Sequence, residues 1–335
     1  MLKSSQSVMK PIWQVRLRRA LHYGDRPWQV LLIAISAIVI VLMLAVGGLL
    51  WVRSARARSA FGWSFLTPTA NPNWDPVNDK FQAWPFLYGT LETSLFAILL
   101  ALPIGIGIAI FLAEISPAWL RTPLTWLVEL LAAIPSVVYG LWGIFVFLPK
   151  VVAPIGVFLG DTIGKVSVLG DLFTGPIPAS GSSRLAASLI LTIMIIPTIA
   201  AVTRDVFLAI PNSQREAAKA LGATEWETIW QVLIPYGRSG ILGAVILGLG
   251  RALGETMAVT MVIGNSIQGG ISLLDPGYSM ASIIANEFAE AVSQLHTDAL
   301  IEIGLILFII TLLLNILARF LVWRVARQAP QEARS

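Results

Sequence analysis

The sequence predicts an all-α, polytopic membrane protein with six transmembrane helices, and three observations support this fold class. Hydrophobic residues make up 56% of the 335 residues and charged residues only 13%, whereas soluble domains carry about 25% charged residues. Six apolar runs each reach the roughly 20 residues that a helix needs to cross the hydrocarbon core. Cysteine is absent, and the two histidines lie far apart, which excludes disulfides, thiolate metal sites and a histidine cluster.

The first apolar run covers residues 28–51 and follows a polar N-terminal tail, residues 1–27. It is too long for the core of a signal peptide and lacks a clear small-residue cleavage site, so we interpret it as a retained anchor helix. A loop at 52–87 separates it from the main membrane domain, residues 88–322, and residues 323–335 form a C-terminal tail. The spans of the main domain are expected at 88–113, 124–148, 185–203, 239–263 and 299–322.

The distribution of Lys and Arg predicts the orientation. About twice as many of these cations fall on the side of the two termini and residues 211–238 as on the other side, which places both termini in the cytoplasm. Arg53, Arg56 and Arg58 oppose this assignment for the first span. The cations on the predicted inner side are Lys3, Lys10, Arg16, Arg18, Arg19, Arg26, Arg121, Arg204, Arg215, Lys219, Arg238, Arg319, Arg324, Arg327 and Arg334.

Three long loops, residues 52–87, 149–184 and 264–298, lie on the predicted outer side. Turn-forming residues dominate 67–77, and residues 281–294 are typical of a short helix at the outer surface. Loops of this length are usually functional or disordered. We therefore expect either a landing surface for a soluble partner or simple connections that shield the pathway.

A polar stretch, residues 211–238, interrupts the apolar sequence and predicts two short helices. Ser213 with Glu216, and Thr224 with Glu227, fit capping boxes. Gly222 stands where the first helix ends, because glycine can turn left-handed without a Cβ clash. Pro235 is expected to end the second helix by removing a donor. The spacing of Trp226, Ile229, Trp230 and Leu233 predicts one apolar stripe on that second helix.

The fifth apolar run carries two opposite charges, Arg251 and Glu255. Four residues apart on a helix, they share one face, near the middle of the membrane, where a charge must face protein or water. Gly250 and Gly254 form a small-xxx-small pair that favours close helix approach. The two charges form either a gate or transient anion site, since guanidinium suits tetrahedral oxyanions, or a structural ion pair between helices.

Three further carboxylates, Glu92, Glu129 and Glu302, fall near the ends of spans. Carboxylates at helix ends usually reach interfacial water, so we expect no transport role for them. Pro103, Pro135 and Pro197 lie inside apolar runs, where each frees a backbone carbonyl and permits bending. Such bends suit either moving helices or static kinks.

The polar stretch resembles the cytoplasmic coupling loop of ABC importer permeases, which is written EAA-x3-G-x9-I-x-L-P. The matching residues are Glu216, Ala217, Ala218, Gly222, Val232, Ile234 and Pro235, with Val and Ile as conservative departures. The resemblance implies that this coupling loop (residues 211–238) docks in a groove of an ATPase subunit, with Trp226 and Trp230 on its second helix. It also implies the type I importer fold, called MetI-like.

Three other stretches, 85–94, 131–143 and 250–259, resemble the permeases of phosphate-specific ABC importers, and the Arg-Ala-Leu-Gly-Glu-Thr run favours the PstC-like branch. The resemblance covers residues 85–325. It implies import of inorganic phosphate across the inner membrane by alternating access. The implied partners are a homologous PstA-like permease, two PstB-like ATPase subunits and a periplasmic PstS-like phosphate-binding protein.

The sequence contains no nucleotide-binding loop of its own. Its nearest string, Gly160 to Val166, has the wrong glycine spacing and lacks Ser or Thr after Lys165. We therefore expect a permease subunit that is not an enzyme and binds no cofactor, with ATP and Mg²⁺ held by the partner ATPase. Other hypotheses are a permease for molybdate or sulfate, a passive anion channel, and a membrane-embedded enzyme, for which the carboxylates are too dispersed.

Overall fold

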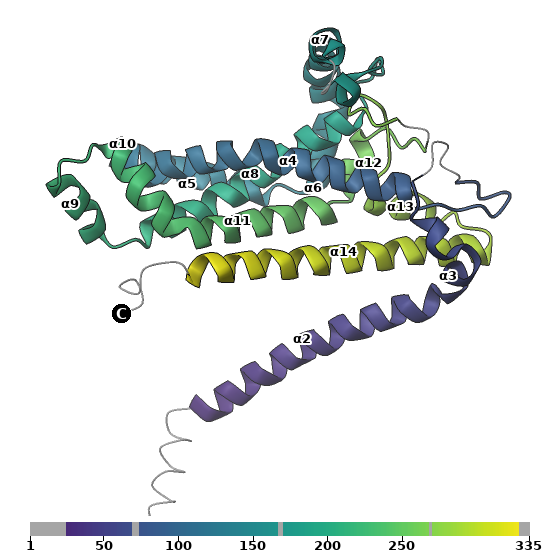
Figure 1. Ribbon diagram of the computed structural model, residues 1–335, viewed down its shortest axis with the longest axis horizontal. Helices are drawn as coiled ribbons and strands as arrows, with labels where there is room; N and C mark the ends of the chain where they lie inside the picture. Colours follow the sequence, from purple (N-terminus) through teal and green to yellow (C-terminus); the bar gives the residue numbers. More distant parts are fainter. Residues whose placement is uncertain (1–24, 69–73, 167–169, 268–269, 328–335) are drawn as a thin grey trace, which may run out of the picture. The chain divides into compact units, whose positions relative to one another are not determined.

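The computed structural model describes residues 25–68, 74–166, 170–267 and 270–327, and these parts of the chain are mainly helical (Figure 1). Among the described residues, six helices are long and apolar enough to cross a membrane, as the sequence predicts. The expected N-terminal tail up to residue 24 and the last eight residues of the chain lie outside the described residues. The chain forms two units, Met1–Val52 and Arg53–Ser335.

Most helices follow one another directly or after a few residues. In chain order they are α2 (Asp25–Arg53), α3 (Ala55–Phe61), η1 (Gly62–Phe65), α4 (Trp84–Ile110), η2 (Phe111–Ile115), α5 (Ala118–Ala133), α6 (Ser136–Trp142), η3 (Gly143–Val152), α7 (Ala153–Thr162), η4 (Ile163–Lys165), η5 (Gly170–Phe173), α8 (Arg184–Leu208), α9 (Asn212–Ala220), α10 (Glu225–Thr228), η6 (Ile229–Leu233), α11 (Ile234–Gly254), α12 (Met257–Val262), α13 (Met280–Glu287) and α14 (Gln294–Arg327).

The first unit is built on α2, whose candidate span runs from Trp28 to Arg53. Its length matches the expected anchor helix, and large apolar side chains are exposed along it, from Trp28 near one end to Trp51 near the other. An apolar helix with exposed side chains all round is suited to a lipid environment rather than to water.

The second unit is a helical bundle with α8 at its centre. Figure 1 shows α4, α8, α11 and α14 running alongside one another, and the α8 span is the most buried of the six. Small residues permit the close packing: a Cβ built on Gly105 of α4 would lie 2.8 Å from the Ile199 side chain of α8. Such small residues let helix backbones approach where lipid supplies no hydrophobic driving force between helices.

The third span differs from the expected 124–148. The helical run breaks at Ile134 and Pro135, which both adopt extended backbone angles, so α5 and α6 are separate helices. The physical reason is that proline forces the preceding residue out of the helical region and donates no hydrogen bond. The uninterrupted candidate span therefore runs from Ser136 to Lys165. By contrast, α4 and α8 continue through Pro103 and Pro197.

The expected outer loop 52–87 is largely ordered around an aromatic cluster. Trp74, Phe81 and Phe86 are buried and pack edge to face, with Trp74–Phe81 and Trp74–Phe86 centroid distances of 4.8 and 4.9 Å. Residues 69–73, part of the expected turn region, lie outside the described residues. The adjoining turn is held by Asp75, whose pKa is lowered by the Asn78 side chain that donates to its carboxylate.

The arginines that oppose the predicted orientation are paired with carboxylates of α14. Arg56 lies 3.7 Å from Asp298, and Arg58 lies 3.6 Å from Glu302. Arg58 also donates to the Ser54 hydroxyl. Two of the three exceptional cations are therefore neutralised locally, which weakens their weight as orientation signals.

The short helix expected at 281–294 is confirmed in kind but is shorter, Met280–Glu287 in α13. It does not lie at the surface along its whole length, since Met280, Ser282 and Ile283 are fully buried against the same core as α14. A capping box between Ser279 and Ser282 starts it, and the Thr90 hydroxyl of α4 accepts from the Met280 amide at 2.8 Å.

Candidate functional site

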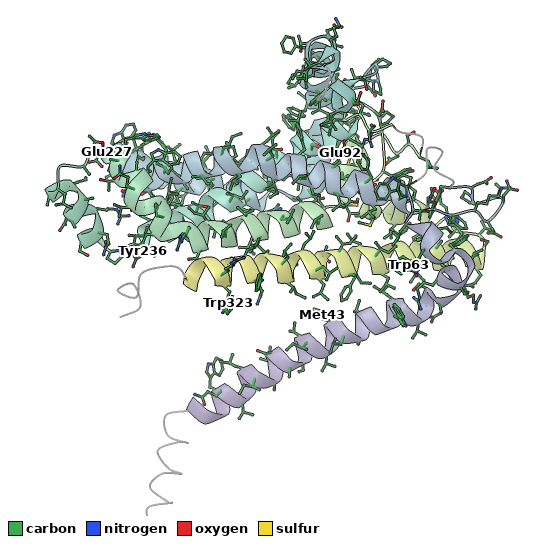
Figure 2. The ribbon with its side chains drawn as sticks, in the orientation of Figure 1. Met43, Trp63, Glu92, Glu227, Tyr236 and Trp323 are labelled. Carbon is green, nitrogen blue, oxygen red and sulfur yellow. The ribbon has the colours of Figure 1, made fainter. Side chains whose placement is uncertain are left out.

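The coupling loop forms one end of the bundle. Figure 2 shows Glu227 at this end and Glu92 well along the bundle towards the opposite end. The expected second capping box is confirmed: the Thr224 amide donates to the Glu227 carboxylate at 2.8 Å, and the Glu227 amide donates to the Thr224 hydroxyl at 3.2 Å. Gly222 has a φ of +91°, which confirms the expected left-handed turn.

The first expected capping box is wrong. Helix α9 begins at Asn212 behind Pro211, which makes no side-chain cap, so Ser213 lies inside the first turn rather than before it. The fixed φ of Pro211 and its missing amide start the helix two residues earlier than a Ser213 cap predicts, with Pro211 in place of Ser213 at the cap.

The expectation that Pro235 ends a helix is also wrong. Helix α11 begins at Ile234 and carries Pro235 in its first turn. The preceding segment, η6, is a π-type turn that continues from α10. A π-type turn shifts the hydrogen-bonding register, and proline is tolerated in a first turn, where its missing donor is not needed. The coupling loop therefore passes into a membrane helix without a break.

The predicted apolar stripe divides into two pairs. Ile229 and Leu233 are buried, with exposed fractions of 3% and 1%, and pack against Phe207 and Ala109 of the bundle. Trp226 and Trp230 instead remain 59% and 52% exposed, with their rings edge to face at 5.6 Å. One pair fixes the segment to the bundle, and the other presents aromatic surface outward.

The motif residues on α9 share this outward exposure. Glu216, Ala217 and Gly222 are exposed, and Leu221 is 90% exposed. A contiguous exposed apolar patch rimmed by polar groups marks a protein interaction site. The two tryptophans and the motif residues therefore form the candidate docking surface at this end of the molecule.

An ion pair that the sequence analysis missed holds α9 in place. The Arg215 guanidinium contacts the Glu114 carboxylate through two nitrogens, with distances of 2.8 and 3.2 Å, and both side chains are largely buried. Arg215 also donates to the carbonyls of Phe207 and Ile210, each at 2.7 Å. In the sequence, the only signal for this pair is that Arg215 and Glu114 carry opposite charges and fall near the same predicted membrane face.

The second candidate region is a helix break after Arg251. Helix α11 ends at Gly254, Glu255 is extended, and α12 begins at Met257. The prediction of one helix over 239–263 with Glu255 on the face of Arg251 is therefore wrong. Glu255 instead accepts from the Ala258 amide at 3.2 Å and so caps α12. Irregular backbone within a membrane bundle is tolerated where it is buried in protein or lines a cavity.

Arg251 and Glu255 do not form an ion pair in the described part of the chain. The Arg251 guanidinium donates to the Thr198 hydroxyl of α8 at 3.3 Å. Among the described residues, close helix approach at Gly250 and Gly254 is also not found, because a Cβ at either position would meet no atom within 4 Å. Arg251 is thus held by a neutral partner, beside an open glycine face.

The three dispersed carboxylates are all paired. Glu92 lies 3.3 Å from Arg184, Glu129 lies 3.5 Å from Arg204, and Glu302 contacts Arg58. Glu92 and Glu302 are largely buried, so the expectation that they reach interfacial water is wrong. Each is buried because a guanidinium lies close enough to offset the cost of desolvating a carboxylate.

Arg184, predicted as an outer-loop cation, is buried at the start of α8. Its guanidinium donates to the carbonyls of Gly270 and Ser272 and lies 3.8 Å from Asp275. It also lies over the Tyr88 ring at 5.3 Å. The residue therefore joins α4, α8 and the segment before α13.

Comparison with known proteins gives consistent matches. The family described as "Binding-protein-dependent transport system inner membrane component" matches residues 105–328. A "Phosphate transport system permease protein PstC" of Xylella fastidiosa is 44% identical over 88% of this chain and 89% of its own length. Proteins of the same name from Pasteurella multocida and Haemophilus influenzae are 48% and 47% identical over 81% and 86% of this chain, and 82% and 89% of their own lengths.

Solved structures share the fold at low sequence identity. A bacterial alginate ABC transporter in complex with its alginate-bound periplasmic protein matches 94% of this chain and 100% of its own, with a TM-score of 0.59 and 16% identity. The inward-facing MetNI methionine ABC transporter matches 71% of this chain and 93% of its own, with a TM-score of 0.51 and 19% identity. These likenesses confirm the predicted MetI-like architecture.

Proposed function

The chain belongs to the family of binding-protein-dependent transport system inner membrane components, and within it to the PstC permease proteins, and on this premise we propose that it conducts inorganic phosphate into the cell. It is a multi-pass membrane permease subunit rather than a catalytic one. The observation that carries the proposal is the identity of 44–48% to phosphate transport permeases over at least 81% of the chain.

The proposal includes the partners that such a permease requires. A PstA-like permease completes the pathway, two PstB-like subunits bind and hydrolyse ATP with Mg²⁺, and a periplasmic PstS-like protein delivers phosphate. Both termini and the coupling loop face the cytoplasm in the inner membrane. ATP hydrolysis by the PstB-like subunits drives alternating access. Because those subunits hold ATP and Mg²⁺, this chain itself needs to bind neither.

The coupling loop supplies the contact with the ATPase. In the proposal Trp226 and Trp230, with Glu216, Ala217, Ala218 and Gly222, form the surface that enters a groove of the ATPase. Exposed tryptophans supply a large share of binding energy when an interface buries them. Pro235 lies at the start of α11, so motion of the docked segment passes directly into a membrane helix.

Arg251 and Glu255 form the proposed phosphate path at the helix break. Arg251 attracts the tetrahedral oxyanion, because guanidinium donors match phosphate oxygens. Glu255 accepts a hydrogen bond from the protonated oxygen of hydrogen phosphate, a donor that sulfate lacks. The absence of an ion pair between the two in the described residues favours this role over a structural pair, since Arg251 keeps donors free for an anion.

The experiment measures uptake of radiolabelled phosphate in cells that lack their own phosphate uptake and express the chain with its cognate partners. Phosphate uptake that depends on the ATPase subunit, and that sulfate and molybdate do not compete, supports the proposal. Competition by either anion favours a permease for another oxyanion. Uptake without any ATPase subunit favours a passive anion channel.

A paired substitution tests the path separately. Changing Arg251→Gln together with Glu255→Gln is expected to abolish uptake while the complex still assembles, as judged by co-purification of all subunits. The matched control is Lys150→Gln, which changes an exposed residue on η3, away in sequence from Arg251 and Glu255. This variant should leave uptake unchanged. Normal uptake by the double variant refutes the path.

A further inference from the structure

The contact between Arg251 and Thr198 joins two helices near the middle of the bundle. Thr198 is the fifteenth residue of α8, so it lies about 15 Å along the axis from the end of α8 at Leu208. The Arg251 guanidinium donates to its hydroxyl oxygen at 3.3 Å. Both residues are only half-buried, so an ion can approach the pair.

The Thr198 hydroxyl differs from those of Thr192 and Thr311 in what it donates to, and Thr203 of the same helix also has no acceptor. Thr192 of the same helix donates to the Ser188 carbonyl at 2.7 Å, and Thr311 of α14 donates to the Leu307 carbonyl at 2.9 Å. In the described part of the chain, Thr198 donates to no acceptor and is bonded only to Arg251. A hydroxyl that accepts one hydrogen bond still has its own proton to donate.

The surroundings leave these donors available. One oxygen of Glu255 accepts from the Ala258 amide, and no ion pair joins Glu255 to Arg251 among the described residues. The helix ends only three residues beyond Arg251. Arg251 and Thr198 therefore present a charged fork and a neutral hydroxyl donor from two different helices. A tetrahedral oxyanion has several acceptor oxygens and is suited to two such donors at once.

We infer that Thr198 and Arg251 form a single oxyanion subsite. When the subsite is empty, the Thr198 hydroxyl accepts a hydrogen bond from the Arg251 guanidinium; when an anion is bound, the same hydroxyl donates a hydrogen bond to it. This inference rests on the proposed phosphate function. It assigns to α8 a residue that contacts the transported anion, so the path is lined by α8 as well as by the break between α11 and α12.

The test compares Thr198→Val, which removes the hydroxyl, with Thr198→Ser, which keeps it. Phosphate uptake is measured with the complete complex, and KM and maximal rate are determined separately. Loss of a hydrogen bond to a charged group raises KM in Thr198→Val by about tenfold or more, whereas Thr198→Ser stays close to wild type. Thr311→Val is the matched control, because its hydroxyl bonds only to its own helix, and KM is unchanged.

The outcomes separate the two proposals. Absence of phosphate uptake by the wild-type complex refutes the proposed function, whatever the variants do. Wild-type uptake with an unchanged KM in Thr198→Val overturns the subsite. A fall in maximal rate that Thr198→Val and Thr198→Ser share, without a change in KM, indicates a packing role and also overturns it. If Thr198→Val does not assemble, Thr198→Ala replaces it, and equal KM values for Ala and Ser overturn the subsite.

Discussion

Arg215 of the coupling loop and Glu114 of the segment after α4 form an ion pair with a shortest distance of 2.8 Å. The two residues are 101 positions apart in the sequence. The same guanidinium also holds the last turn of α8 and Ile210 through two carbonyls. One side chain therefore ties α9 to the ends of two bundle helices, so a displacement of α9 acts on both.

Breaking this ion pair is expected to uncouple ATP hydrolysis from transport. Glu114→Gln or Arg215→Met each leaves a largely buried partner unpaired, which costs about 3 kcal/mol or more. We expect a lower melting temperature of the purified complex and a lower ratio of phosphate imported to ATP hydrolysed. The double variant Glu114→Gln with Arg215→Met should cost less than the sum of the two single variants, and strictly additive losses would contradict a direct pairwise role.

The control for that experiment is the exposed pair of Lys219 and Glu225, which lies in the same loop at 2.6 Å. Exposed ion pairs contribute about 0–1 kcal/mol. Lys219→Met should therefore leave both the melting temperature and the transport ratio near wild type.

The exposed aromatic pair and the buried aliphatic pair of the second coupling helix should respond differently to substitution, the first in ATPase binding and the second in stability. Trp226→Ala or Trp230→Ala should weaken ATPase binding by about 2 kcal/mol, with the melting temperature of the isolated permease unchanged, because both rings are exposed. Ile229→Ala should lower stability by about 2–5 kcal/mol. Co-purification and thermal unfolding measure the two effects, and a destabilised Trp230→Ala would contradict the division.

Gly222 should tolerate little besides glycine. An alanine there is forced to keep a φ of +91°, which costs roughly 1–2 kcal/mol, although no neighbouring atom obstructs its Cβ. Gly222→Ala should reduce uptake more than Gly222→Asn does, because asparagine adopts left-handed angles more readily. Gly107→Ala, equally unobstructed but helical, is the control, and equal effects of both alanines would exclude a conformational cause.

Arg184 should be required for the stability of the second unit. Arg184→Met removes its bonds to the Ser272 and Gly270 carbonyls and leaves Glu92 buried without a cation, at a cost of about 3–5 kcal/mol. Adding Glu92→Gln should recover part of the loss, as measured by thermal unfolding in detergent. Lys165→Met, which breaks an exposed pair with Asp161, should have almost no effect.

Features that depend on local sequence could be predicted. Hydropathy alone identifies six spans, because crossing a membrane requires length and apolarity whatever the packing. Thr224 and Glu227 interact within one helical turn, and Gly222 needs a backbone angle that few other residues accept. Each of these outcomes is decided within a few residues, so tertiary contacts had little to change.

Features that depend on competition between local signals or on distant partners could not be predicted. Pro235 was expected to end a helix, but it lies in the first turn of α11 behind the π-type segment η6. In that position the missing amide of proline is not needed, so the helix continues. Glu255 was expected to lie on the same helix face as Arg251, but it caps α12 instead. The Arg215–Glu114 and Arg184–Glu92 pairs join residues far apart in sequence, and no spacing rule relates them.

The uninterrupted passage from η6 into α11 has a mechanical consequence. Arg251 lies 17 positions beyond Ile234, the first residue of α11, which corresponds to about 25 Å along the axis. A tilt of roughly 7° about that first turn would carry Arg251 sideways by about 3 Å over this lever arm. That displacement is comparable to the 3.3 Å contact with Thr198, so a small rotation at the coupling-loop end of α11 is enough to make or break the contact with α8.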